Sequence, residues 1–153
     1  MKTVQCIVCV AFLALLGCAS AALPGVEPLR ELAKGNFSGF TDAKQEVIKT
    51  KADWEKTWAK LSARGSDRDK LPQVDFTKEM VVLVAMGQKR TGGYSIEVTK
   101  VETFGDKLKI HIKRREPPPD AFTLQVITSP FHAVAARKND LKPEFVETKA
   151  DSK

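Results

Sequence analysis

The pattern of apolar and polar positions predicts one short helix in the first half of the chain. Trp54, Trp58 and Leu61 recur at the spacing of one helical face. Thr50, with Asp53 three residues later, forms a capping-box-like helix start. We interpret the two tryptophans as the core anchor of this helix rather than as a ligand platform, because residues at helical spacing usually face the core.

On either side of this helix, the pattern is that of β-strands. An unbroken apolar run is typical of a central strand covered on both faces, and alternation of apolar with polar residues predicts half-buried strands. The expected strands are 45–49, 80–86, 94–99, 107–113, 122–126 and 131–136, with a short edge segment at 143–146. The sequence therefore predicts an α+β fold, in which one short helix packs on an antiparallel, meander-like sheet of about five or six strands.

The N-terminal residues form a segment of a different kind. A weakly positive start is followed by an apolar run, Val4 to Leu16, and then by small residues. This layout predicts a signal peptide over residues 1–21, because the run is shorter than the roughly 20 residues that a membrane-spanning helix needs. Two processing routes stay open, cleavage at Ala19-Ser20-Ala21 or lipidation of Cys18 in a lipobox-like sequence. We expect a secreted or cell-surface protein, or one held to the membrane through lipid on Cys18.

The remaining chain divides into a spacer, one domain and a tail. Prolines and glycines mark residues 22–36 as a spacer with one helical turn around Leu29–Ala33. The domain is expected at 37–147 and the tail at 148–153, and the charged stretch 62–70 is expected to be mobile. Asn36-Phe37-Ser38 is a candidate N-glycosylation site on a eukaryotic secretory route.

Composition excludes several kinds of chemistry. The chain has 153 residues and three cysteines, and all three cysteines lie in the predicted export segment. The mature domain would therefore hold no disulfide and no cysteine metal site. The net charge of +6 is spread along the chain, which indicates a solvated surface with a mild preference for acidic partners. Nucleic acid is not an expected partner, because the sequence contains no known binding motif and no platform of aromatic and basic residues.

No set of residues in the sequence predicts catalysis. Of the two histidines, His111 alternates with lysines on a strand and is expected to face solvent. His132 follows a strand break, where it could contact a partner or lie at the edge of the core. Neither has the spacing of a metal site, and the serines lack the Gly-x-Ser-x-Gly elbow of many hydrolases, although triad members need not be adjacent. We expect no enzyme activity and no cofactor.

Two stiff turns form the candidate binding surface. Gly87 to Tyr94 contains a double glycine suited to a tight turn, and Pro117-Pro118-Pro119 favours a stiff extended segment. In a meander both turns fall at the same end of the sheet. The residues expected to contact a partner are Lys89, Arg90, Thr91, Gly92, Gly93, Tyr94, Arg115, Pro117, Pro118, Pro119 and His132. A second candidate surface is the cationic strand face Lys107-Lys109-His111-Lys113-Arg115, which is more simply interpreted as solvated.

The same segments resemble a known family. Val74-Asp-Phe76, Gly87-Gln-Lys-Arg-Thr-Gly-Gly-Tyr-Ser-Ile96, Glu116-Pro-Pro-Pro119 and Thr128-Ser-Pro-Phe-His132 are, in this order and spacing, similar to the PrcB C-terminal domain family. Asp53-Trp54 and Trp58 fit the same pattern, so the resemblance covers about 37–137. Where this chain has Arg90, the family often has proline, which would alter the stiffness of that loop.

The resemblance implies an exported domain associated with a protease complex. The family takes its name from an exported lipoprotein subunit thought to support assembly or stability of a surface protease. We therefore expect a non-catalytic domain that binds another exported protein. The alternative is a secreted protease inhibitor, because Thr91-Gly92-Gly93-Tyr94 is similar to a loop of chagasin-type inhibitors. An uncharacterised hydrolase is a third interpretation.

Overall fold

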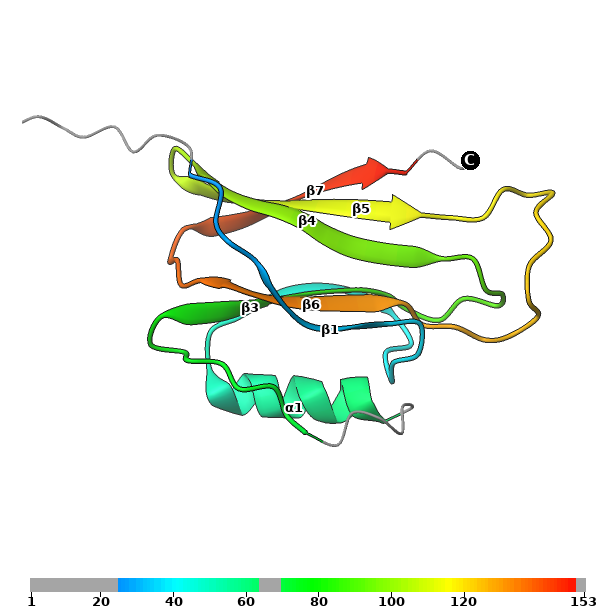
Figure 1. Cartoon of the computed structure of the whole chain (residues 1–153), viewed down its shortest axis with the longest axis horizontal. Helices are drawn as coiled ribbons and strands as arrows, with labels where there is room; N and C mark the ends of the chain where they lie inside the picture. Colours follow the sequence, from blue (N-terminus) through cyan, green and yellow to red (C-terminus); the bar gives the residue numbers. More distant parts are fainter. Residues whose placement is uncertain (1–24, 64–69, 151–153) are drawn as a thin grey trace, which may run out of the picture.

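The structure is a computed structural model that describes residues 25–63 and 70–150, which form three layers (Figure 1). A four-stranded sheet lies in the middle, a three-stranded sheet covers one of its faces, and a helix covers the other. The predicted signal peptide, the candidate lipidation site Cys18 and most of the predicted mobile stretch 62–70 lie outside the described residues.

Seven strands of the described chain divide between the two sheets. Neighbours in the middle sheet are antiparallel, and its order is β1 (Arg30–Gly35), β6 (Phe131–Arg137), β3 (Glu79–Met86) and β2 (Ala43–Ile48). The order in the second sheet is β4 (Ser95–Phe104), β5 (Lys107–Arg115) and β7 (Lys142–Lys149). There β4 is antiparallel to β5, whereas β7 is parallel to it.

Strand β3 is the centre of the fold because both of its faces are covered. Met80, Val82 and Val84 contribute to the core between the two sheets, whereas Val81 and Leu83 contribute to the core under the helix. The unbroken apolar run predicted such a strand, and the prediction is confirmed.

The single helix of the described residues, α1 (Lys51–Ser62), begins and packs as its sequence indicates. The Thr50 side chain accepts a hydrogen bond from the Asp53 backbone N–H, which caps the first turn. Trp54, Trp58 and Leu61 are buried against the middle sheet, and the two indole rings lie 5.4 Å apart. Within the described part of the chain there is no helix with the length and apolar character to span a bilayer.

The predicted α+β class, with one helix on a mainly antiparallel sheet, is confirmed, but the arrangement of strands is not a meander. The strand that follows β3 in sequence joins the second sheet, because both edges of β3 are occupied by β2 and β6. The connection at residues 87–94 therefore crosses between sheets instead of closing a hairpin. Similarly, β7 pairs in parallel with β5 and extends over more residues than the predicted edge segment.

Two local predictions are wrong. Residues 30–35, expected as a spacer around a helical turn, form β1, because β6 offers a free edge to which this segment pairs. Residues 122–126, expected as a half-buried strand, form part of a long connection, because β5 already has β4 and β7 on its two edges. The alternation of Phe122, Leu124 and Val126 therefore does not mark one side of a sheet.

Candidate functional site

Two connections meet at one end of the two sheets. Residues 87–94 lead from β3 to β4, and residues 116–130 lead from β5 back to β6 (Figure 1). Both connections start from strands that end on the same side of the molecule, the right side of Figure 1. We call residues 87–94 and 116–130 the paired loops.

Backbone hydrogen bonds hold the paired loops together. Lys89 and Thr128 exchange two of them, with N···O distances of 2.7 and 2.9 Å. The Gly92 N–H donates to the Leu124 carbonyl at 2.9 Å, and the Thr128 hydroxyl donates to the Thr91 carbonyl at 2.8 Å. The two loops therefore form one braced unit. The predicted proximity of the double-glycine turn to the triple proline is confirmed by Pro117, whose Cβ lies 3.0 Å from the Cβ position of Gly93.

Glycines are required at two points of this unit. Gly93 has φ of 89°, and a Cβ added there would lie 3.0 Å from Cβ of Pro117. Gly87 has φ of 69°, and an added Cβ would lie 2.7 Å from the backbone oxygen of Thr41. Side chains are disfavoured at both positive φ values, and neither contact leaves ordinary room for one. Gly93 thus lets the triple-proline segment approach the first loop.

The structure brings together ten of the eleven residues predicted to contact a partner. The exposed members are Arg90, Gly93, Arg115, Pro118 and Pro119, and the half-buried members are Lys89, Thr91, Gly92, Tyr94 and Pro117. Tyr94 packs against the core between the sheets, and the Lys89 ammonium lies 5.5 Å from the centre of its ring. Asn36, the candidate N-glycosylation site, is exposed on the connection before β2 and is not part of this cluster.

His132 is the exception, because it is buried with 3% of its surface exposed. Its Nδ1 accepts the Val98 backbone N–H at 2.9 Å, so a β6 side chain bonds to the backbone of β4 across the two sheets. The neutral ring must then carry its hydrogen on Nε2, which lies 3.2 Å from the Glu31 carboxylate. The placement of His132 on the partner-contacting surface is therefore wrong, and its role is to join the sheets.

The surroundings of His132 favour the neutral ring. Burial lowers the pKa of His132 below its ordinary value, and Glu31 only partly opposes this effect. Protonation would also put a hydrogen on Nδ1, where the Val98 N–H needs an acceptor.

Other candidate chemistry in the described residues is also structural. The Ser129 hydroxyl donates to the Ser38 carbonyl at 2.6 Å and accepts the Ser38 N–H at 2.7 Å, so this buried serine fastens two loops. His132 has backbone and carboxylate partners rather than a serine hydroxyl. Residues 25–63 and 70–150 contain no group of three or more His, Cys, Asp or Glu side chains arranged to hold a metal ion.

The cationic face of β5 is balanced by neighbouring strands. Lys107 pairs with Glu144 of β7 at 2.9 Å, and this hydrogen bond raises the pKa of Lys107. His111 bonds to Glu102 of β4 at 2.7 Å, and hydrogen bonds from Lys100 and His111 lower the pKa of Glu102. The solvated interpretation of this face therefore fits its geometry.

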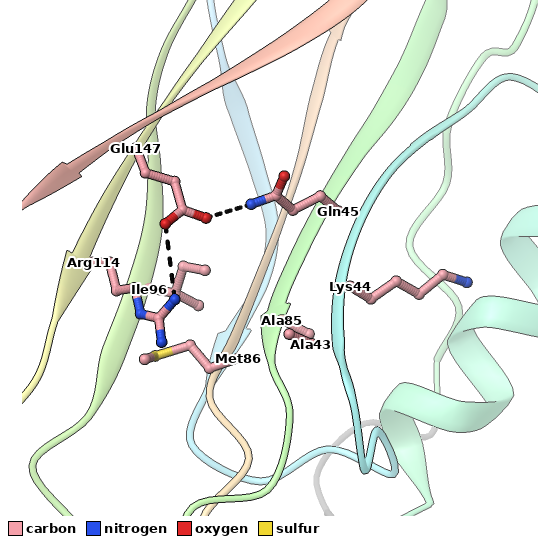
Figure 2. Close-up of a pocket in the computed structure, with 8 residues that line it drawn as sticks. All are labelled: Ala43, Lys44, Gln45, Ala85, Met86, Ile96, Arg114 and Glu147. Carbon is pink, nitrogen blue, oxygen red and sulfur yellow. Dashed lines mark hydrogen bonds and ion pairs between the residues drawn. The ribbon is translucent and has the colours of Figure 1, made fainter.

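A small crevice opens between the two sheets at the β2 edge (Figure 2). Its volume is about 220 Å³, and Met86 and Ile96 line it together with polar groups. Glu147 of β7 accepts from the Gln45 amide at 2.5 Å and lies 3.8 Å from the Arg114 guanidinium. These groups bond to each other across the opening, as Figure 2 shows. We therefore interpret the crevice as a place where polar side chains link the two sheets, rather than as a ligand site.

Sequence reasoning missed the most exposed apolar group of the paired loops. Phe122 is fully exposed (110%), Leu124 and Ile127 are 78% and 57% exposed, and Val126 is 39% exposed. Their alternation with polar residues predicts a half-buried strand, so these side chains were not considered as part of a binding surface. Two signals could have indicated a connection instead, since the run lies between Pro117-Pro118-Pro119 and Pro130.

One of three comparisons with known proteins found a match, and it covers the central part of the domain. The described residues define a β-sandwich-like α+β domain that carries two braced loops at one end. Residues 80–136 match the model of the family described as PrcB C-terminal, which confirms the resemblance over this segment. The matched segment runs from β3 to β6 and contains both of the paired loops. The comparison with curated proteins and the comparison with solved structures gave no match.

Proposed function

We propose that this chain is an exported, non-catalytic protein-binding domain that supports the assembly or stability of a protease complex. The paired loops are its binding surface. The observation that carries this proposal is that backbone hydrogen bonds brace the two loops while their apolar side chains face outward. A surface that is ordered before binding loses little conformational entropy on association, which favours a specific partner.

The family match and the histidine geometry support two parts of the proposal. The segment that matches the PrcB C-terminal family contains both loops, and the family name indicates a protease-complex subunit. His132, which could otherwise act as a general base, has its Nδ1 engaged by the Val98 backbone and is buried. A binding role therefore fits the described residues better than hydrolysis does.

A protease inhibitor that inserts Thr91-Gly92-Gly93-Tyr94 into a cleft has less support. The Thr91 carbonyl and the Gly92 N–H are already bonded to the second loop, so this turn cannot offer both groups to an enzyme. An inhibition assay against papain-like proteases decides between the two roles. Slowed peptide cleavage at micromolar chain would favour the inhibitor.

The proposal is tested by mixing the purified chain with candidate exported proteases from the same source. We expect co-elution with one protease and a longer lifetime of that protease on heating or during self-digestion. The chain itself should cleave no casein or peptide substrate. A chain that neither co-elutes with nor protects any of these proteases would contradict the proposal.

A further inference from the structure

The segment from Phe122 to Ile127 combines high exposure with a fixed backbone. Four apolar side chains within this segment face solvent, and Phe122 is the most exposed of them. Single exposed apolar residues are ordinary on protein surfaces, but a contiguous group of them usually marks an interaction site. The connection that carries them, 116–130, is also longer than most loops in compact domains, and such loops are usually functional.

The backbone of this segment is held on both sides. The Leu124 carbonyl accepts the Gly92 N–H from the first loop and the Val126 N–H from its own loop, each at 2.9 Å. Before Phe122, the Ala121 N–H donates to the Pro118 carbonyl at 3.0 Å, which closes a turn after the prolines. Thr123 points inward, since its methyl group lies 3.5 Å from the Cβ position of Gly93. Phe122 and Leu124 are thus directed outward by neighbours that are themselves fixed.

The charges beside the segment define the rim of a matching surface. Arg90 and Arg115 are exposed, and within the described chain neither has an ion-pair partner. In contrast, Glu116 is paired with Arg114 at 2.8 Å. The two free guanidinium groups therefore favour carboxylates on the partner, because opposite charges at an interface rim speed and orient association.

We propose that Phe122 and Leu124 insert into an apolar groove of a partner protein whose rim carries carboxylates opposite Arg90 and Arg115. This inference rests on the proposed protein-binding function and names the anchor residues and the chemistry of the partner. A second copy of the chain is a poorer occupant, because it would bring the same arginines together. A lipid surface with anionic headgroups would attract the same two guanidinium groups, so binding to vesicles is measured separately from binding to the partner protein.

The anchors are tested in the full chain, starting with a photo-crosslinking residue in place of Phe122. The exported protein that this chain crosslinks is then purified, and its affinity for unmodified variants is measured by titration. We expect Phe122→Ser to weaken binding by about tenfold or more and Leu124→Ser by less, since a central aromatic anchor usually contributes most. Phe104→Ser is the matched control, because Phe104 is 57% exposed at the β4–β5 turn and should leave the affinity unchanged.

The charged rim has its own readout. We expect Arg90→Glu combined with Arg115→Glu to slow association and to reduce its dependence on salt, while Lys56→Glu on the helix leaves both unchanged. An association rate that depends equally on salt in the wild type and in the double variant would contradict the carboxylates proposed for the partner's rim.

Four further outcomes separate this inference from the proposed function. Full binding by Phe122→Ser, with loss of binding on Gly93→Ala, would overturn the anchors and leave the paired loops as the surface. Unchanged binding in all of these variants would overturn the surface itself. Sedimentation of the chain with vesicles of phosphatidylcholine and phosphatidylglycerol, lost in Phe122→Ser, would assign the anchors to lipid, and dimerisation lost in Phe122→Ser would assign them to a second copy.

Discussion

At the scale of single residues, His132 links the two sheets of the described chain. It is buried, it belongs to one sheet, and it accepts a backbone hydrogen bond from the other sheet. The Val98 N–H that it accepts lies beside a shift in the register between β4 and β5, which falls between Val98 and Lys100. The register shift in one sheet and the histidine of the other therefore meet at the same point between the two sheets.

Replacing His132 by leucine should lower the stability of the domain. The leucine fills similar space but removes the Nδ1 acceptor of the buried Val98 N–H, and such a loss costs about 1–3 kcal/mol. Urea unfolding measures the change. Glu31→Gln is the control, since Glu31 is 61% exposed and should cost much less. Equal losses in the two variants would contradict the role given to Nδ1.

The same residue should make stability depend on pH. The pKa of His132 is lowered in the folded state, so the unfolded chain binds the proton more readily. Stability should be complete above the ordinary histidine pKa of about 6.5 and should fall as the pH decreases below it. Unfolding by urea between neutral and mildly acidic pH measures this, and His132→Leu should flatten the curve in that window. If the free energy of unfolding of His132→Leu fell with decreasing pH as much as that of the wild type, other titratable groups would be the cause.

At the scale of elements, the paired loops depend on the contact between a glycine and a proline. Gly93→Ala should destabilise the domain by about 1–3 kcal/mol through its positive φ, and its new Cβ should also push against Pro117. Gly105→Ala is a matched control, because Gly105 has φ of 60° but open space around it. Urea unfolding should show the larger loss for Gly93→Ala, and partner titration should show weaker binding for that variant alone. Equal effects of the two changes would show that the contact between the new Cβ at position 93 and Pro117 contributes nothing to stability or binding.

At the scale of the whole molecule, the first strand is part of the domain. Strand β1 pairs with β6, and Leu32 and Ala33 pack against the core under the helix. A chain that begins at Phe37 would lose this strand and expose the edge of β6, including the side of His132 that faces Glu31. We expect its thermal unfolding temperature to fall well below that of a chain that begins at Gly25. Identical unfolding temperatures would show that the middle sheet is stable with three strands.

Much of this molecule could be predicted from local patterns. The helix start at Thr50 and the stripe of Trp54, Trp58 and Leu61 depend on neighbouring residues, so the sequence is enough to find them. The same holds for β3, whose apolar run requires cover on both faces. The end of the sheets at which the two loops meet was also predicted, because strand direction alternates along the chain whichever sheet each strand joins.

Other features could not be predicted because they depend on which strand edges are free. The same alternation that makes β5 a strand leaves Phe122 and Leu124 on an exposed connection, since β4 and β7 already occupy both edges of β5. Conversely, Arg30–Gly35 has little strand character and becomes β1 because β6 has an open edge. The sequence left His132 open between a partner contact and the edge of the core, and the packing of the two sheets decided for burial against the Val98 N–H.

The sequence by itself thus determined the helix, the central strand and the stiffness of the two turns, because these follow from short-range periodicity and from the backbone limits of glycine and proline. The tertiary structure decided the division into two sheets, the burial of His132 and the outward direction of Phe122 and Leu124. These features result from competition between distant segments for the same hydrogen-bonding edges and the same apolar faces, and no local pattern records which segment prevails.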